Sequence, residues 1–346
     1  MFDRMFSLAE RSLYVADLDL WIDSRAPRTR CYVSHGHSDH ARAHDTIVTT
    51  PVNAAICRSR FARTASRAVS RGSRGPSPER PPQPACDFEE HAFSEPWTDG
   101  EHRLTLFPAG HVLGSAQLLI ESEHGRFVYT GDFKLTKSRT CEPAHVERCD
   151  VLLMECTFGR PRYVFPPREE VEAALIAFAQ NALEDGVAPI LHAYSLGKAQ
   201  EAMAILGAAD IPLTVHNAVA EIARVYAHHG VQLPPYERYN AATYDGTSAL
   251  IWPPGANPPT APQIQRRRTA MLTGWALATG AAQRYGVDTV IPLSDHADFP
   301  SLLRYIELAQ PKTVLLNHGW KDFAWRLRDR GIDATFLEPY EQLALF

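Results

Sequence analysis

The sequence has no long hydrophobic run, and apolar stretches such as Val151–Met154 are far too short to cross a bilayer. Its first residues, Met1–Arg4, include an acid and lack the extended apolar stretch of a secretory signal. Cysteine is scarce, with six residues and no CxxC pair, so we expect buried, reduced thiols. These absences favour a cytoplasmic protein without a membrane partner.

An excess of positive charge is also missing, because 35 lysines and arginines face 40 acids and the net charge is −5. A nucleic-acid site would therefore need a local basic lining, since no general positive field would attract a polyanion. We find no internal repeat. With 45% hydrophobic and 22% charged residues, the 346-residue chain is long enough for one large domain or two modest ones.

Short β patterns alternate with helical patterns along the chain, which is typical of an α/β fold. Runs rich in β-branched, aromatic and aliphatic residues predict strands at 30–34, 104–107, 117–120, 126–130, 151–155, 189–192 and 313–317. Apolar residues on one face predict helices at 169–184 and 300–310, and others that start near Gly197 and Asn217.

Two stretches depart from this rhythm. Residues 58–84 hold seven arginines, one acid and a tail rich in glycine, serine and proline, so we expect an exposed loop or lid. It is either a plain surface insertion or a contact for a nucleic-acid strand. Residues 253–263 are rich in proline and predict a surface connection.

The densest group of ligand-type side chains is the heptapeptide Ser34–His40, with three histidines and an aspartate directly after a predicted strand. Such a cluster is costly to pack in a core, because each neutral imidazole needs its own hydrogen-bond partners. As a metal site the spacing makes sense. In a tight loop His35 and His37 can point to one centre while Asp39 and His40 point to another.

Three further predicted strands lead into a ligand-type residue, namely His111, Asp132 and His318. Open α/β sheets assemble sites in this way, along the edge where the carboxyl ends of the strands meet. Together with the heptapeptide, these residues predict a dinuclear metal site.

The whole series resembles the ligand set of metallo-β-lactamase-fold hydrolases that hold two zinc ions. The resemblance implies one ion on His35, His37 and His111, a second on Asp39, His40 and His318, and Asp132 as the bridge. Asp23 matches the aspartate of the family's first motif, which supports the ligand loop from behind, and a buried structural aspartate is the alternative. Zinc is the expected metal, with manganese as an alternative, because nitrogen and oxygen ligands select weakly between the two.

The long stretch of sequence between Asp132 and His318 distinguishes the chain from simple members of this fold. Motifs around Glu155, His296 and His318 resemble motifs A, B and C of the β-CASP nucleases. The implied fold is an α/β metallo-β-lactamase αββα sandwich with an inserted β-CASP α/β domain. The expected division is 1–157 for the first part of the metallo-β-lactamase domain, 158–290 for the insert and 291–346 for the second part.

The expected catalytic set is His296, Glu155, Asp39 and Asp132. A protonated His296 is suited to release the alkoxide of a phosphodiester, and Glu155 would orient it and favour its charged form. A core histidine and a capping carboxylate are the alternatives for this pair. The segment Ser195–Lys198 opens a predicted helix, and Ser195, Gly197 and Lys198 would receive a substrate phosphate unless they form an ordinary helix cap.

Within the family, Gly110–Gln117, Tyr194–Gln200, Gly274-Trp275 and Leu293–Asp298 resemble the bacterial DNA-ligase-associated exonucleases. The resemblance and the short carboxyl-terminal part imply a DNA exonuclease in repair, acting on single strands or DNA ends, with a functional link to an ATP-dependent DNA ligase. The alternatives are a β-CASP ribonuclease in RNA processing and an inactive nucleic-acid-binding scaffold. The complete ligand series argues against the scaffold, and the insert argues against a small-molecule hydrolase.

Overall fold

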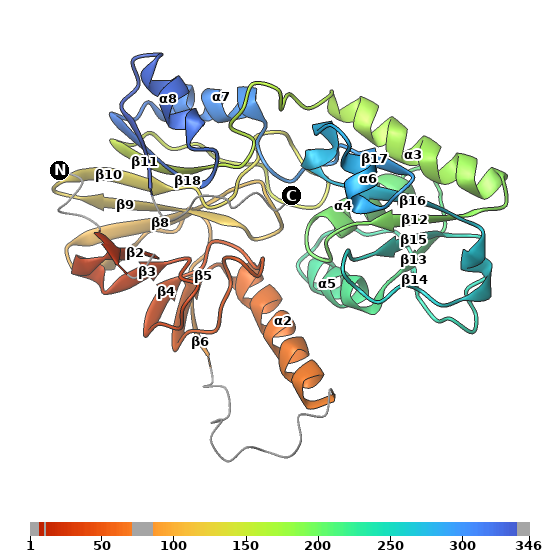
Figure 1. Ribbon diagram of the computed structural model, residues 1–346. Coiled ribbons are helices and arrows are strands. Elements are labelled where there is room, and N and C mark those ends of the chain that lie inside the picture. Colours follow the sequence, from red (N-terminus) through yellow and green to blue (C-terminus); the bar gives the residue numbers. More distant parts are fainter. Residues whose placement is uncertain (1–6, 10–11, 71–85, 338–346) are drawn as a thin grey trace.

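The computed structural model describes residues 7–9, 12–70 and 86–337. It has two lobes, as Figure 1 shows. The sandwich lobe comprises two face-to-face sheets and the helices on their outer faces, built from the described residues up to 156 and from 299–336. The insert lobe, Arg168–Ile291, holds the third sheet. Within the described ranges, no helix is both long and apolar enough to cross a membrane.

The first sheet of the sandwich lobe has six strands. Its order is β1 (Ser7–Ala9), β2 (Ser12–Val15), β3 (Leu20–Ile22), β4 (Arg30–Tyr32), β5 (Thr46–Thr49) and β6 (Asp87–Glu90). The 3-10 helix η1 (Ala16–Leu18) links β2 to β3. Strands β3 to β6 run parallel, so the carboxyl ends of β4 and β5 lie at the same edge. The loop after β4 is the histidine-rich heptapeptide.

The second sheet has seven strands. Its order is β19 (Ala334–Phe336), β18 (Thr313–Gly319), β11 (Val151–Cys156), β10 (Gly125–Tyr129), β9 (Ala116–Ser122), β8 (His102–Pro108) and β7 (Trp97–Asp99). Successive side chains of a strand point to opposite faces. Accordingly Leu118 and Ile120 pack against the first sheet, in one core with Leu20 and Tyr32, while Leu119 faces the outer helices.

Helices cover both outer faces of the sandwich. On the second sheet lie α7 (Phe299–Ala309) and α8 (Asp322–Arg328), which bury Tyr305 and Phe323. On the first sheet lies α2 (Pro51–Ser70), whose Cys57 packs with Cys31 and Ile47. This is the αββα arrangement that the family resemblance implies, and the strands and helices predicted from the sequence are all present.

The expectation of an exposed loop at 58–84 is wrong for its first part, because α2 continues to Ser70. Arginine and alanine both have high helix propensity, and the helix is already anchored by buried residues such as Ala54 and Ile56. The guanidinium of Arg58 pairs with Glu90 at 2.6 Å and lies over the ring of Phe88. Residues 71–84 lie outside the described residues.

The insert lobe contains a six-stranded sheet in which all pairings are parallel. Its order is β14 (Glu237–Arg238), β13 (Leu213–Val215), β15 (Ala249–Trp252), β12 (Ala188–His192), β16 (Arg267–Leu272) and β17 (Thr289–Ile291). The remaining elements are α3 (Arg168–Glu184), α4 (Lys198–Gly207), α5 (Asn217–His228), α6 (Ala281–Tyr285), η2 (Pro262–Gln265) and η3 (Gly274–Leu277). Both faces of a parallel sheet are covered, which explains why β12 and β15 read as continuous apolar runs.

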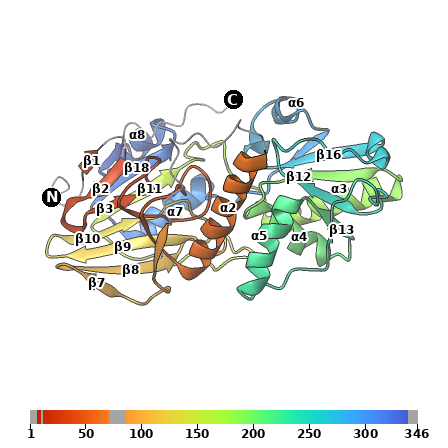
Figure 2. The same cartoon turned by 90° about the horizontal axis from the view of Figure 1, so that it is seen from below.

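An apolar contact joins the lobes. Ile56 of α2 packs with Ile222 and Tyr226 of α5, and Val112 and Leu196 belong to the same cluster. Figure 2 shows α2 beside α5 along this junction. The loop after β12 therefore approaches the loop after β8, which carries His111.

Candidate metal centre

Asp23 organises the histidine-rich loop. Its carboxylate accepts hydrogen bonds from Ser34 N at 2.8 Å, Ser34 Oγ at 2.6 Å, His40 Nδ1 at 2.7 Å and the Tyr129 hydroxyl at 2.7 Å. Since the Ser34 hydroxyl donates to Asp23, it accepts from His35 Nδ1, which lies 3.0 Å away. The Nδ1 atoms of both imidazoles are thus engaged, and their Nε2 atoms face the opposite side.

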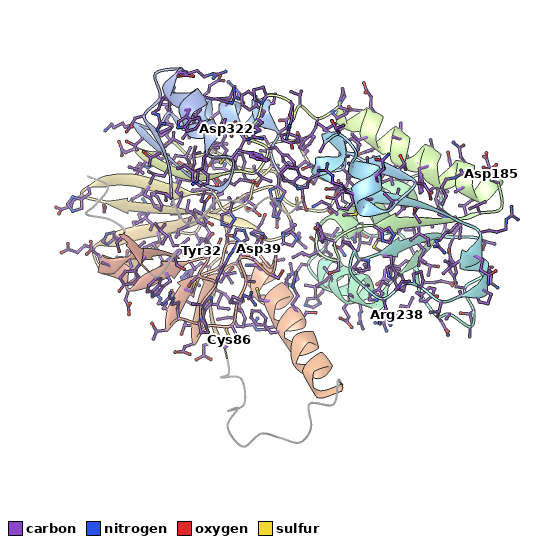
Figure 3. All side chains as sticks on the ribbon, in the orientation of Figure 1. Tyr32, Asp39, Cys86, Asp185, Arg238 and Asp322 are labelled. Carbon is purple, nitrogen blue, oxygen red and sulfur yellow. The ribbon has the colours of Figure 1, made fainter. Side chains whose placement is uncertain are left out.

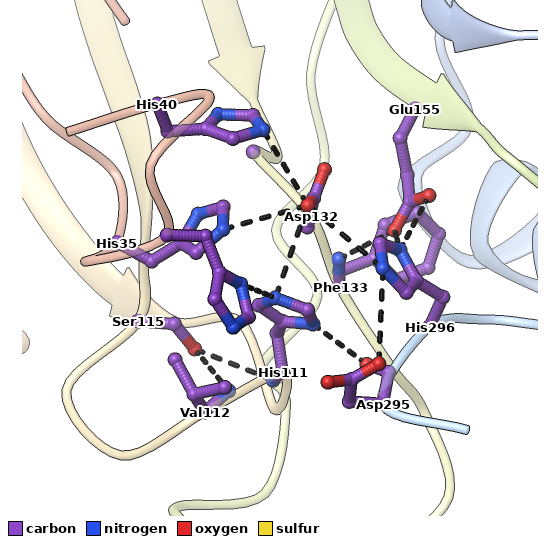
Figure 4. A network of polar contacts seen from close by, with 12 residues as sticks. His35, His40, His111, Val112, Ser115, Asp132, Phe133, Glu155, Asp295 and His296 are labelled. Carbon is purple, nitrogen blue, oxygen red and sulfur yellow. Dashed lines mark hydrogen bonds and ion pairs between the residues drawn. The ribbon is translucent and has the colours of Figure 1, made fainter. Parts of the chain in front are cut away.

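Asp132, directly after β10, is the centre on which these nitrogens converge (Figure 4). Its Oδ2 lies 3.4 Å from His35 Nε2, 3.4 Å from His40 Nε2 and 3.8 Å from His111 Nε2. His37 joins the group through its Nδ1, which lies 3.0 Å from His111 Nε2. The side chains come from three separate loops, after β4, β8 and β10.

The donor atoms of this cluster fit a metal ion. Atoms of His35, His37, His111 and Asp132 lie within 4.8 Å of one another. The Nε2 atoms of His35 and His40 are buried and have no hydrogen-bond partner. An unsatisfied buried polar group costs about 1–3 kcal/mol, which a cation at this position would remove. Three imidazoles and a carboxylate are a donor set that zinc accepts.

The residues expected for the second ion lie next to this cluster but are spread more widely. His40 Nε2 is 4.0 Å from Asp39 Oδ2, and the rings of His40 and His318 are stacked with centroids 4.8 Å apart. The Asp39 side chain is 55% exposed and lies at the edge of the sandwich lobe that faces the insert lobe (Figure 3). Asp39, His40 and His318 do not form a compact group of three among the described residues.

Burial controls the protonation of these imidazoles. It lowers the pKa of His37, His111 and His318 to about 4, and that of His35 well below its ordinary value. These rings are therefore neutral at pH 7 and offer lone pairs. Burial also disfavours the charged form of His40, but Asp132 and Asp23 raise its pKa well above the usual range. A bound cation would compete with the proton that His40 carries at neutral pH.

His296 and Glu155 form a pair beside the cluster. His296 Nδ1 lies 2.9 Å from both Glu155 oxygens, and Glu155 Oε1 also accepts from Phe133 N at 2.9 Å. Burial opposes protonation of His296, yet Glu155 and Asp132 raise its pKa to about 9, so the ring is a cation at neutral pH. Its Nε2 lies 4.0 Å from Asp132 Oδ2, and its side chain is 20% exposed.

The predicted phosphate-binding segment has a different environment from the one expected. The Gly197 N–H donates to Gln200 Oε1 at 2.9 Å, and Ser195 O accepts from Gln200 Nε2 at 3.0 Å. Lys198 is buried and forms an ion pair with Asp295. The Gly197 N–H and the Lys198 ammonium are thus engaged within the protein, which does not favour the phosphate role predicted for these two residues.

Two groups at the site were not assigned from the sequence. The carbonyl oxygen of Asp295 accepts from His111 Nδ1 at 2.8 Å, and that of Leu196 lies 3.2 Å from His37 Nε2. Asp295 stands beside His296 in the sequence, which was the only signal available for it. A backbone carbonyl such as that of Leu196 leaves no mark in the sequence.

The αββα sandwich and a histidine and carboxylate cluster at its strand ends define a metal-dependent hydrolase. Family models agree: residues 30–215 match the beta-lactamase superfamily domain, and residues 282–336 match a Zn-dependent metallo-hydrolase RNA specificity domain. The chain belongs to the metallo-β-lactamase β-CASP nuclease family.

The chain is similar to several curated proteins, and it matches between 21% and 66% of the length of the three described next. It is 38% identical over 338 residues to a "Probable DNA ligase" of Opitutus terrae, covering 96% of this chain and 31% of that protein. It is 36% identical over 134 residues to the "Transcription termination factor FttA" of Pyrococcus abyssi, covering 36% of this chain and 21% of that protein. It is 25% identical over 282 residues to an "RNase J-like protein" of Methanocaldococcus jannaschii, covering 67% and 66%.

Among solved structures, a protein of unknown function from Enterococcus faecalis matches with a TM-score of 0.56. The match covers 89% of this chain and 79% of that chain at 15% identity. At this identity the likeness concerns the fold alone.

Proposed function

We propose that this chain is an exonuclease that hydrolyses phosphodiester bonds of DNA. The observation that supports hydrolysis is the charged His296, held by Glu155 at 2.9 Å, with its Nε2 4.0 Å from the central carboxylate of the ligand cluster. A phosphodiester oxygen has no proton of its own, so an acid at this position serves the departing alkoxide.

The ligand assignment is part of the proposal. His35, His37, His111 and Asp132 would hold one divalent ion, and Asp39, His40 and His318 a second one that shares Asp132. Both ions would be zinc, with manganese as the alternative. When bound, such a pair lowers the pKa of water and neutralises phosphate charge. Asp23 holds the ligand loop, and Asp39, half exposed at the edge, is open to an incoming water.

His296 then donates its Nε2 proton to the leaving oxygen, and the Glu155 carboxylate stabilises the cation before transfer. Residues 158–290 would form the inserted β-CASP domain, and the nucleic acid would lie between the two lobes. Whether the proton moves before or together with cleavage of the P–O bond, His296 must lie within hydrogen-bond reach of the leaving oxygen. The side chains of His296 and Asp39 are accessible from the junction of the lobes for that purpose.

The choice of DNA rests on the match of 96% of the chain to a protein called a probable DNA ligase. The chain matches 31% of that protein, so the likeness suits a nuclease that works with an ATP-dependent ligase in cytoplasmic DNA repair. Single-stranded DNA or a DNA end would be the substrate.

A β-CASP ribonuclease is the second candidate, favoured by specific observations. The domain matched at 282–336 is described as an RNA specificity domain, and a relative matching 67% of the chain is called RNase J-like.

An assay with labelled oligonucleotides separates the two candidates. Single- and double-stranded DNA and RNA, each labelled at the 5′ or the 3′ end, would be incubated with zinc- or manganese-loaded protein. We expect stepwise shortening of single-stranded DNA from one end, with His296→Ala as the inactive control. Hydrolysis of RNA alone would establish the ribonuclease, and hydrolysis of neither would refute the proposed function.

A further inference from the structure

The first turn of α4 reaches from the insert lobe into the metal centre. At its start, the carbonyl oxygen of Leu196 lies 3.2 Å from His37 Nε2. Two residues later, the ammonium of Lys198 forms an ion pair with the carboxylate of Asp295. Lys198 is 6% exposed and Asp295 is 5% exposed, so the pair is closed off from solvent.

The backbone of Asp295 contacts His111, one of the proposed ligands. Its carbonyl oxygen can only accept, so His111 Nδ1, 2.8 Å away, donates and carries the proton of the neutral ring. The lone pair of His111 is then on Nε2, which faces Asp132 at 3.8 Å. Groups behind a ligand fix its tautomer and its orientation in this way. Asp295 also precedes His296, so its position affects the acid as well.

The helix that carries Lys198 is itself fixed. Glu201 accepts hydrogen bonds from Arg139 N at 2.8 Å and from the Thr140 hydroxyl at 2.6 Å, and it forms an ion pair with Arg168. Gly197 has φ +85°, and a Cβ there would lie 2.5 Å from Val112 Cγ1, so glycine permits the close approach of α4 to the loop of His111.

A contact with substrate phosphate does not explain this lysine. Its ammonium lies 5.0 Å from the ring centroid of Tyr194, and the lysine itself is only 6% exposed. A buried ion pair stabilises a fold little more than apolar residues of the same size would. A role in fixing the geometry around Asp295 therefore explains the pair better than a role in stability.

We propose that Lys198 is a positioning residue of the metal centre: its ion pair with Asp295 holds the Asp295 carbonyl against His111 and thereby makes the ligand geometry depend on the docked insert lobe. The inference rests on the proposed function in one respect, that the cluster binds metal ions. It assigns to the insert lobe a part in metal binding besides any contact with nucleic acid.

The test measures zinc affinity without substrate, by competition with a chromophoric chelator, in the full chain. Lys198→Met should weaken zinc binding about ten- to a hundredfold, the usual effect of losing a group behind a ligand. Asp295→Asn keeps the backbone carbonyl and the side-chain shape and should give a similar loss. The double variant should be no worse than either single one, since both remove the same ion pair.

Arg168→Met is the matched control. It removes the other ion pair that anchors α4, with Glu201, and touches none of the ligands. We expect lower unfolding stability with zinc affinity unchanged. An equal affinity loss in this variant would overturn the proposal, because it would trace the effect to the stability of α4.

The remaining outcomes are separate. If the wild-type protein binds neither zinc nor manganese, the proposed function fails. If it binds zinc and both Lys198→Met and Asp295→Asn bind as tightly, the positioning role is refuted. Unchanged zinc affinity with a raised KM for single-stranded DNA would also refute it, and would make Lys198 a substrate contact. Should Lys198→Met not fold, Asp295→Asn decides.

Discussion

At the scale of single residues, the site separates two kinds of histidine by their surroundings. His35, His37 and His111 are buried among other imidazoles and are neutral, as ligands must be. His296 is half-buried, but it faces Glu155 and Asp132, which raise its pKa to about 9, so its ring is charged at neutral pH. The same side chain is therefore suited to bind a cation in one place and to donate a proton in the other.

The role of His296 can be separated from metal binding. His296→Ala should lower kcat by roughly a hundredfold or more, because general acid catalysis contributes about that much. Zinc content by elemental analysis should stay at the wild-type level. A phosphodiester with a nitrophenolate leaving group should be hydrolysed with a smaller loss, since that group leaves without a proton. Loss of zinc in the variant would contradict the assignment and make His296 a ligand.

At the scale of elements, the proposed ligands lie at the ends of strands, His318 within β18 and the others in the loops that follow β4, β8 and β10. The turn after β8 illustrates the constraint, since Gly110 has φ +74° immediately before His111. A Cβ on this residue would lie 2.3 Å from the carbonyl oxygen of Lys134, far inside contact distance. The turn can therefore deliver His111 to Asp132 only with glycine at this position.

Gly110→Ala should destabilise the fold and weaken zinc binding together. The left-handed backbone alone costs roughly 1–2 kcal/mol for a residue with a Cβ, and the clash adds to it. Gly186→Ala is the control, because Gly186 has φ +63° and nothing within 4 Å of the added Cβ. Urea unfolding and chelator competition would measure both variants. Equal losses in the two would show that the contact with Lys134 has no effect.

At the scale of the whole molecule, the cluster couples metal binding to the arrangement of the chain. The proposed ligands come from the loops after β4, β8 and β10 and from β18, and the backbone carbonyls of Leu196 and Asp295 contact two of them. A preformed site of this kind does not exist in the unfolded chain, so binding free energy adds to folding free energy.

Removal of the metal should therefore lower the melting temperature. At a free zinc concentration a hundredfold above Kd, binding to the folded state alone contributes about 2.7 kcal/mol. Dialysis against a chelator and calorimetry would measure the shift, and added zinc should reverse it, whereas magnesium should not. A chelated protein that melts at the original temperature would argue against a metal site that stabilises the fold.

The arginines of the 58–84 segment can be tested for a contribution to nucleic-acid binding. Burial is the main cause of the lowered pKa of His37, and the charge of Arg60 on α2 is a smaller one. Replacing 71–84, which holds three arginines, by a Gly/Ser linker removes the rest of the segment without cutting α2. We expect the slope of log affinity for single-stranded DNA against log salt to become shallower by up to about 2, or about 0.7 per cation.

Lys312→Gln is the control for this salt series. Lys312 is 76% exposed and pairs with Asp150 next to the amino ends of β11 and β18, the edge opposite the ligands. Its removal should leave the slope unchanged. An unchanged slope in the linker variant would leave the segment as an insertion without a role in strand binding.

Much of this protein follows from its sequence alone. Runs rich in β-branched, aromatic and aliphatic residues predict the strands, because such side chains fit a buried or half-buried sheet. The ligand-type residues were found because His35, His111, Asp132 and His318 follow or end strands, where a parallel arrangement gathers side chains at one edge. Local chemistry and spacing were sufficient for these predictions.

Other features depend on contacts between distant segments. Helix formation by the arginine-rich residues up to Ser70 was missed, because the anchoring of α2 on the first sheet and on α5 is a tertiary property. Lys198 resembled a phosphate-binding lysine in sequence, and only the packed structure places it against Asp295, nearly a hundred residues away. The surroundings of a charged side chain depend on which segments pack against it. The buried ion pair of Lys198 and Asp295 joins two segments that are far apart in the chain, so no local sequence pattern predicts it.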